Sequence, residues 1–217
     1  MPTFSDTGLF LALEGGEGGG KSTQGQLLVD WLMAEGRSVL ATREPGGTPL
    51  GARLRELVLD RATGDIAART EALIYAADKA EHVASVILPA LAEGQVVVCD
   101  RYVDSTLAYQ GAGRQIEVAE LEPVARWATL DLRPHLTVVL DIDPEVGLVR
   151  AGRAGAGHDR IESEPLEFHR RVRGHFLDLA ATDPEHYVVV AADRPSDVVH
   201  AEIRAAVAAR LEAGADR

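Results

Sequence analysis

Apolar residues fall along the chain in short runs that are separated by longer amphipathic stretches. Several of these runs are continuously apolar, such as VVVC, LTVVL and YVVVA. A continuous apolar run is typical of a parallel strand that is covered on both faces. The pattern predicts five β-strands, at residues 9–13, 38–42, 96–99, 136–140 and 187–191.

The stretches between these runs have helical spacing. In 26–35, for example, Leu27, Leu28, Trp31 and Leu32 share one face. Similar spacing predicts helices at 70–93 (where a proline at 89 could interrupt), 117–130, 165–181 and 196–211. Alternating strands and helices predict one α/β domain over 1–217, with a parallel five-stranded sheet and helices on both faces. Three segments break the pattern and are interpreted as two irregular insertions and a frayed tail: 44–51, 150–160 and 212–217.

Composition and charge narrow the function classes. The net charge of -12 argues against a nucleic-acid-binding surface, although a local basic pocket stays compatible with it. The single cysteine, Cys99, excludes an internal disulfide framework and fits a reducing compartment. We find neither a signal-peptide pattern nor a run approaching the ~20 apolar residues of a membrane span. The expectation is a cytoplasmic protein with no nucleic-acid or membrane partner.

A phosphate-binding loop is the strongest motif. The pattern G-x-x-x-x-G-K-S runs from Gly15 to Ser22, between an apolar strand and an amphipathic helix. Glycines let backbone N–H groups turn toward a phosphate, and the helix adds its positive N-terminal end. Lys21 is expected to reach the β- and γ-phosphates and Ser22 to ligate Mg²⁺. The motif predicts a nucleoside triphosphate bound by Gly15, Gly16, Glu17, Gly18, Gly19, Gly20, Lys21, Ser22 and Thr23, in preference to a glycine-rich surface loop.

Asp100 and Arg101 follow the run VVVC, at the sheet edge where α/β proteins bind ligands. A carboxylate in the position of Asp100 holds Mg²⁺ through water in phosphate-loop enzymes. The alternative is an aspartate that caps the next helix. Arg101 offers a bidentate fork for a phosphate, although a lone arginine is more often a solvated surface residue.

Three motifs in order resemble the bacterial thymidylate kinases: LEGGEGGGKST at 13–23, TREPGGTPLG at 42–51 and DRYVDSTLAYQG at 100–111. The resemblance extends over nearly the whole chain, through YAADKAEHV at 75–83, LDIDPEVGLVR at 140–150 and DRIE at 159–162. It implies a P-loop NTPase-type fold with a mobile lid, and Mg²⁺-dependent transfer of the γ-phosphoryl group of ATP to dTMP. The product, dTDP, leads to dTTP, and the family implies a homodimer.

The resemblance also implies residues that bind dTMP. Arg43 and Arg101 would hold its phosphate, and a dianion between two guanidinium groups is a sensible charge match. Tyr75 would stack on thymine, although it could be a core aromatic. Tyr109 would lie beside the deoxyribose and leave little room for a 2′-hydroxyl. The residues expected along the base are Ser105, Thr106 and Gln110.

Two further positions require comment. Lys79 stands where the family usually has arginine, and lysine cannot make the same planar two-point contact with base or phosphate. Glu17 lies inside the phosphate loop and would accept a hydrogen bond from the 3′-hydroxyl of dTMP. The alternative for Glu17 is a solvated loop carboxylate, because a carboxylate beside a triphosphate is repelled by it.

The catalytic cations are expected in a lid at 150–160. The phosphate loop has no arginine, whereas one branch of the family places its catalytic arginine there. Arg150, Arg153 and Arg160 lie among glycines and alanines, which resembles the branch whose lid supplies the transition-state charge. The expected catalytic set is Lys21, Asp100, Arg101, Arg153 and Arg160, with Arg150 at ATP; Arg153 and Arg160 are not ranked. His158 is interpreted as a solvated lid residue, and Asp141 and Asp143 as a strand end and a helix cap.

Two other function classes compete with this interpretation. A deoxynucleoside kinase or a kinase for another monophosphate would share the phosphate loop, but not REPGG and AYQG together. A GTPase-like switch would need a guanine-reading N-K-x-D segment, and the sequence has none.

Overall fold

The computed structural model describes residues 5, 7–153 and 159–215. Its centre is a five-stranded sheet in the order β2-β3-β1-β4-β5, and every pairing is parallel. The predicted strands are confirmed, with ends that differ by a residue at most. They are β1 Leu9–Glu14, β2 Val39–Arg43, β3 Val96–Asp100, β4 Leu136–Asp141 and β5 Tyr187–Ala191.

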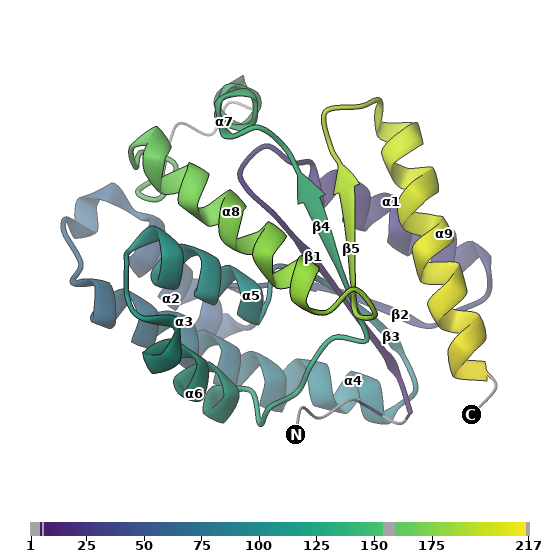
Figure 1. Cartoon of the computed structure of the whole chain (residues 1–217). Coiled ribbons are helices and arrows are strands. Elements are labelled where there is room, and N and C mark those ends of the chain that lie inside the picture. Colours follow the sequence, from purple (N-terminus) through teal and green to yellow (C-terminus); the bar gives the residue numbers. More distant parts are fainter. Residues whose placement is uncertain (1–4, 6, 154–158, 216–217) are drawn as a thin grey trace.

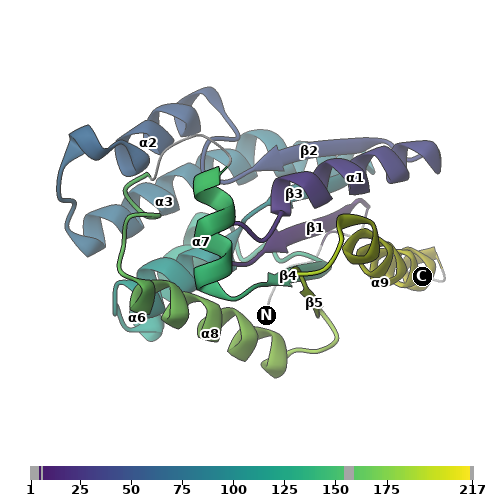
Figure 2. The same cartoon turned by 90° about the horizontal axis from the view of Figure 1, so that it is seen from above.

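Helices cover both faces of this sheet (Figure 1, Figure 2). α1 and α9 pack on one face, whereas α3, α6 and α8 lie on the other. The helix bounds are α1 Lys21–Ala34, α2 Pro49–Leu59, α3 Ala68–His82, α4 Leu88–Ala92, α5 Val103–Thr106, α6 Val118–Ala128, α7 Pro144–Arg153, α8 Leu166–Thr182 and α9 Ser196–Ala215. Shorter turns at Arg61–Thr63, Val83–Ile87 and Leu107–Gly113 connect them. The arrangement is that of P-loop NTPases.

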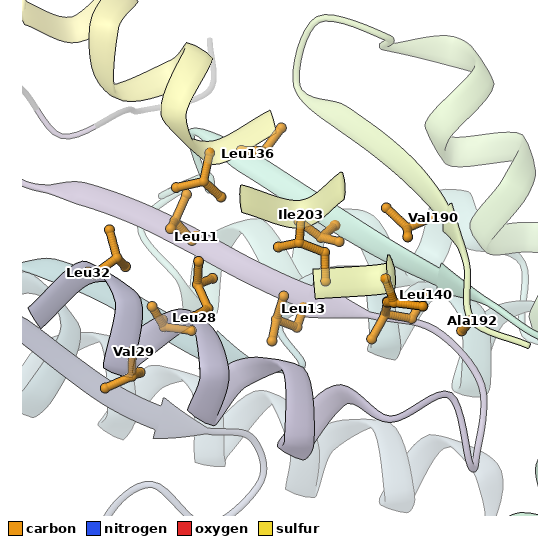
Figure 3. Close-up of a cluster of buried hydrophobic side chains, with 14 of the residues drawn as sticks. Leu11, Leu13, Leu28, Val29, Leu32, Leu136, Leu140, Val190, Ala192 and Ile203 are labelled. Atoms are coloured by element: carbon orange, nitrogen blue, oxygen red, sulfur yellow. The ribbon is translucent and has the colours of Figure 1, made fainter. Parts of the chain in front are cut away.

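Strand alternation divides the core between the two faces. Leu11 and Leu13 of β1 point toward α1 and α9, where they meet Leu28 and Ile203 in a fully buried cluster (Figure 3). Phe10 of β1, with Ala12, points to the opposite face and packs against α3 to α6. Full burial of one such large apolar side chain contributes about 1.5–3 kcal/mol. The central strand is therefore held from both sides, and the loop that follows it has a rigid base.

The helix that starts at Pro49 was not predicted. Residues 44–51 were interpreted as an irregular insertion, but only 44–48 lie outside a helix. Thr48 Oγ1 accepts a hydrogen bond from Gly51 N at 2.9 Å, and Pro49 occupies the first turn. A threonine cap followed by proline is a common helix start, so the sequence signal was present but overlooked.

Other boundaries also differ from the prediction. Pro89 does not break the helical path, because it lies in the first turn of α4, directly after the π-helical turn Val83–Ile87. Residues 150–153, assigned to an irregular insertion, form the end of α7. The last helix continues to Ala215, so residues 212–215 are not a frayed tail. Residues 154–158 of the predicted lid, with His158, lie outside the described residues.

The parallel arrangement brings the carboxyl ends of the strands to one edge. Glu14 ends β1, Arg43 ends β2 and Asp100 ends β3, and Arg43 and Asp100 pair in register. Ligands of α/β proteins bind at this edge. Within the described part of the chain, no helix has the length and apolarity needed to cross a membrane.

Candidate active site

The phosphate loop lies between β1 and α1. Gly15, Gly18 and Gly20 have left-handed φ angles of +126°, +66° and +84°, which favour glycine. No side chain caps the N-terminus of α1, and its first turn has no acidic residue. The backbone N–H groups there are therefore available to an anion. The loop has the strand–loop–helix geometry expected of a phosphate cradle.

Two backbone contacts define the shape of this loop. A Cβ atom on Gly15 would overlap Leu140 O of β4, and one on Gly18 would overlap Gly147 O of α7. Conversely, a Cβ atom on Gly147 would overlap Glu17 O. The loop therefore approaches β4 and α7 closely through main-chain atoms.

Lys21 lies over the loop rather than in solvent. Its Nζ donates to Gly16 O at 2.7 Å and to Gly15 O at 3.1 Å, and its side chain is buried. Burial and the nearby Arg101 lower the pKa of Lys21 to about 8, against the opposing effect of Glu17. The ammonium group is therefore held where it can exchange loop carbonyls for phosphate oxygens.

Ser22 and Asp100 converge at the start of α1. Ser22 Oγ donates to Asp100 Oδ2 at 2.8 Å, and both residues line the same cavity. A hydroxyl and a carboxylate are oxygen ligands of the kind that Mg²⁺ prefers. The described residues contain no group of three or more histidine, cysteine, aspartate or glutamate side chains suited to a metal.

Arg101 adopts an unusual backbone conformation. Its φ of +71° is in the left-handed region, which costs a non-glycine residue on the order of 1 kcal/mol or more. Its guanidinium donates to Glu17 Oε1 at 2.7 Å, Gly15 O at 3.0 Å and Ser105 Oγ at 3.2 Å. Arg101 is therefore fixed between the phosphate loop and α5, and it is not a solvated surface arginine.

Glu17 is the carboxylate partner of this arginine. It also accepts a hydrogen bond from Tyr109 Oη at 2.6 Å, and its side chain is only 17% exposed. Burial opposes ionisation, but Arg101, Lys21 and the Tyr109 hydroxyl lower the pKa of Glu17 to about 2. Glu17 is charged at neutral pH and faces the cavity, so it is not a freely solvated loop carboxylate.

These residues open onto a cavity of about 370 Å³. Most of the predicted site residues line it: Glu17, Gly18, Gly20, Lys21, Ser22, Thr23, Arg43, Tyr75, Lys79, Asp100, Arg101, Ser105, Thr106, Tyr109 and Gln110. The lining also includes residues that the sequence did not single out: Glu44, Pro45, Arg55, Leu59, Asp159, Ile161 and Glu162. Gly15, Gly16 and Gly19 contribute to the loop without lining the cavity.

Lys79 is already paired with a carboxylate. Its Nζ lies 2.9 Å from Glu44 Oε2, and both side chains are almost fully buried. Glu44 also accepts from His82 Nδ1 at 2.8 Å. The Lys79 ammonium lies 5.9 Å from the centre of the Tyr75 ring, and Tyr75 faces the cavity. This pairing explains how the chain accommodates a lysine at the position where the resembling family usually has arginine.

Three polar side chains from α5 and the π-helical turn Leu107–Gly113 line the cavity. Thr106 is buried, and its Oγ1 has no hydrogen-bond partner within the described residues. Gln110 is also buried, and its Nε2 donates to Glu71 Oε1 at 2.8 Å. Ser105 Oγ donates to Glu14 Oε2 at 2.6 Å, so its hydroxyl hydrogen is already committed. Ser105 therefore supports Arg101, and in this it differs from Thr106 and Gln110.

Glu14 is a buried functional neighbour that sequence reasoning missed. It accepts hydrogen bonds from Tyr102 N at 2.8 Å and Ser105 N at 3.1 Å, in addition to Ser105 Oγ. Burial and the nearby Asp104 raise the pKa of Glu14 to about 7. The available signal was a carboxylate at the end of an otherwise apolar strand, LFLALE. Glu14 fixes the turn that carries Arg101.

Two of the predicted lid arginines, Arg150 and Arg160, have partners away from the phosphate loop. Arg150 donates to Ala192 O at 2.8 Å, outside the cavity. Arg160 donates from Nε to Val58 O at 2.8 Å, and its guanidinium is ion-paired with Glu71. Arg153 ends α7, but its side chain is not among those described. Asp141 ends β4, as predicted, where Arg173 pairs with it, and Asp143 Oδ1 accepts from Glu145 N in the first turn of α7.

Comparisons with known proteins agree on one family. The family model described as thymidylate kinase matches residues 13–203. A thymidylate kinase of Leifsonia xyli is 53% identical over 204 residues, which cover 94% of this chain and 96% of the relative. One from Deinococcus radiodurans is 52% identical over 203 residues, with 94% and 98% covered. The crystal structure of thymidylate kinase from Ehrlichia chaffeensis superposes with a TM-score of 0.76 at 29% identity, covering 92% of this chain and 98% of that one.

Proposed function

The chain belongs to the thymidylate kinase family, and on that premise we propose how its residues carry out the reaction. The enzyme transfers the γ-phosphoryl group of ATP to dTMP and forms dTDP. One observation carries the assignment of roles. A single cavity is lined both by phosphate-loop residues and by Tyr75, Thr106 and Gln110, and Glu17 and Arg101 line it as well. We assign the phosphate loop to ATP and call the part formed by Tyr75, Thr106 and Gln110 the base end.

ATP binds with its phosphates on the loop 15–20 and the N-terminus of α1. Lys21 leaves the carbonyls of Gly15 and Gly16 and contacts the β- and γ-phosphates. Ser22 and Asp100 would hold Mg²⁺, which in such enzymes neutralises charge that develops between the β- and γ-phosphoryl groups. The support for this is the 2.8 Å contact between the Ser22 hydroxyl and the Asp100 carboxylate.

The phosphate of dTMP binds among three arginines. Arg43, Arg55 and Arg101 all line the cavity. Burial and the positive charge of Arg43 lower the pKa of Arg55, which is the signature of cations gathered in one place. Such a cluster in a chain with a net charge of -12 is a local site for a dianion. Arg55 is therefore added to the predicted phosphate ligands.

The nucleoside part of dTMP extends from Glu17 to the base end. Glu17 accepts the hydrogen bond of the 3′-hydroxyl, since it is charged and already ordered by Arg101 and Tyr109. The ring of Tyr109 lies beside the deoxyribose. Tyr75 stacks on the base, and the unpartnered hydroxyl of Thr106 is placed to bond its edge. Each of these groups lines the cavity.

The chemical step needs little from a general base. A phosphate monoester has a second pKa of about 6, so the attacking oxygen of dTMP is deprotonated at neutral pH. Catalysis then depends on alignment and on positive charge around the transferring phosphoryl group. Lys21 and Arg101 supply part of that charge from the rigid loop region. Because Arg160 pairs with Glu71, we assign the remaining lid charge to Arg153.

The test is an ADP-release assay across the nucleoside monophosphates. We expect turnover with dTMP and near silence when the acceptor is omitted. A kinase for another monophosphate would prefer a different acceptor, and a nucleotide-binding switch would turn over ATP or GTP without one. Either result would contradict the assignment.

A homodimer is proposed through the face formed by α2 and α3. These helices expose large apolar side chains, with Leu50, Leu57 and Leu73 at 48%, 49% and 60%. A second copy of the chain would cover such a face more favourably than water. Light scattering after size exclusion would measure the mass, and Leu57→Glu with Leu73→Glu should yield monomers. A monomeric wild type would contradict the proposal.

The cytoplasmic location also stays a proposal. It is supported by the single cysteine, Cys99, which is buried and unpaired, as in proteins of a reducing compartment. Fractionation of cells that produce the full chain would test it.

A further inference from the structure

Glu71 of α3 is a buried carboxylate that serves several partners at the base end of the cavity. Its Oε1 accepts from Gln110 Nε2 at 2.8 Å and from Arg114 Nε at 3.1 Å. Its Oε2 accepts from Arg114 at 3.2 Å and pairs with Arg160. The side chain has no exposed surface. None of the phosphate-handling steps uses this residue.

The charge on Glu71 fixes the orientation of the Gln110 amide. An ionised carboxylate can only accept hydrogen bonds, so the NH₂ group of Gln110 must face it and the amide oxygen must point elsewhere. Burial alone would raise the pKa of Glu71, but hydrogen bonds from Arg114, Gln110 and Arg160 outweigh it and lower that pKa. Glu71 therefore keeps no proton to donate to the amide oxygen.

This orientation determines what the cavity offers to a base. Gln110 lines the cavity beside Thr106, and Tyr75, one helical turn after Glu71, lines it as well. With its nitrogen held by Glu71, Gln110 presents an acceptor oxygen. The Thr106 hydroxyl can donate or accept, so it tolerates either kind of partner. The discriminating group is thus the Gln110 oxygen.

We infer that Glu71 is a positioning residue for base selection: by holding the Gln110 amide nitrogen, it makes the site favour pyrimidines that carry a hydrogen on N3. This inference rests on the proposed binding of dTMP with its base at this end. Thymine and uracil carry a hydrogen on N3, whereas N3 of cytosine is itself an acceptor. Two acceptors face to face leave a buried polar group unsatisfied, which disfavours cytosine.

The inference separates two kinds of selectivity. Glu71 acts on the choice between an N3 donor and an N3 acceptor, and hence between dTMP and dCMP. It does not act on the 5-methyl group, which is the only difference between dTMP and dUMP. A general loss of structure would lower turnover with all three substrates and would not single out one ratio.

The experiment is to measure kcat/KM for dTMP, dUMP and dCMP in the wild type and in Glu71→Gln. A glutamine at 71 can present either its oxygen or its nitrogen, so the Gln110 amide can turn over. We expect the dTMP:dCMP ratio to fall about tenfold, which corresponds to about 1.4 kcal/mol and is of the size expected for the loss of one oriented hydrogen bond. The dTMP:dUMP ratio should stay unchanged.

Glu164→Gln is the matched control. Glu164 accepts from Arg114 NH1 at 2.5 Å, so this variant also removes an ion pair of the same arginine. The Gln110 amide nitrogen donates to Glu71 and not to Glu164, so this variant should leave both substrate ratios unchanged. Gln110→Met is the second variant and should lower the dTMP:dCMP ratio by itself. In the Gln110→Met background, Glu71→Gln should then cause no further fall in the dTMP:dCMP ratio.

Three outcomes would overturn the inference. The first is that Glu71→Gln lowers kcat/KM for dTMP and for dCMP by the same factor. The second is that Glu71→Gln lowers the dTMP:dCMP ratio as much in the Gln110→Met background as in the wild type. The third outcome is a full dTMP:dCMP ratio in Gln110→Met, which decides the matter even if Glu71→Gln fails to fold. A wild type that does not phosphorylate dTMP would instead contradict the proposed function.

Discussion

The two ends of the cavity are built in different ways. At the phosphate end, main-chain atoms of one short segment, 15–20, form the binding surface, and few side chains are needed. At the base end, side chains from α3, from 100–114 and from 159–164 form a hydrogen-bonded network around Glu71. The first construction is local and serves any nucleoside triphosphate. The second is assembled only by the tertiary fold and can select one acceptor.

Replacement of Asp100 should produce the largest effect, at the phosphate end. Asp100→Asn keeps the shape but removes the charge that would hold Mg²⁺ beside Ser22. A bound metal ion supplies several kcal/mol of charge stabilisation in the transition state, so we expect kcat to fall by more than ~10³. Steady-state assays over a range of Mg²⁺ concentrations would measure it, with circular dichroism to verify folding. Near-full activity at limiting Mg²⁺ would mean that Asp100 only caps a helix.

The two lid arginines should divide between the two ends. Arg153→Ala should lower kcat by ~10³, because transition-state arginines are worth that much or more, and Arg153→Lys should restore only part of it. Arg160→Ala should instead raise the KM for dTMP, since Arg160 pairs with Glu71. The assignment of Arg160 to the base end would be wrong if Arg160→Ala lowered kcat and left the KM for dTMP unaffected.

Glu17 lies at the boundary and should affect dTMP more than ATP. Glu17→Gln weakens the contacts with Arg101 and Tyr109, and we expect the KM for dTMP to rise about tenfold with a smaller change in kcat. Initial-rate kinetics with each nucleotide varied in turn would separate the effects. An equal rise in the KM for ATP would show that Glu17 serves both nucleotides and does not act mainly on dTMP.

The smallest effect concerns stability rather than turnover. The pKa of Glu14 is raised to about 7 in the folded protein, so between about pH 4.5 and 7 the folded state binds more protons than the unfolded state. The Glu14 contribution to the free energy of unfolding therefore falls as pH rises through this window. Glu14→Gln should flatten that slope in urea titrations. An unchanged slope would show that Glu14 titrates near its ordinary pKa.

The phosphate end could be predicted from sequence because its determinants are contiguous. Gly15 to Ser22 form one motif, and the apolar runs beside it define β1 and the start of α1. Asp100 and Arg101 were also found, since a strand end in a parallel sheet has a known position relative to the loop. The five strands were predictable for the same reason: each is a local apolar run.

The base end could not be predicted in the same detail. Glu71 is a single charged residue in an amphipathic helix, and nothing nearby indicates that it is buried against Gln110, Arg114 and Arg160. Arg55 was missed because no helix was predicted over the segment that forms α2. These residues depend on contacts between segments up to 89 positions apart, which local patterns do not record.

The contact between Gly18 and Gly147 sets a rule for building chimeric enzymes. A Cβ atom on Gly18 would overlap Gly147 O, and a Cβ atom on Gly147 would overlap Glu17 O, so the first turn of α7 and the phosphate loop must match each other in shape. A lid taken from another kinase can therefore be grafted only beyond residue 147, with the junction in the second half of α7. A graft that begins earlier would have to bring its own phosphate loop, so the two segments are exchanged together or not at all.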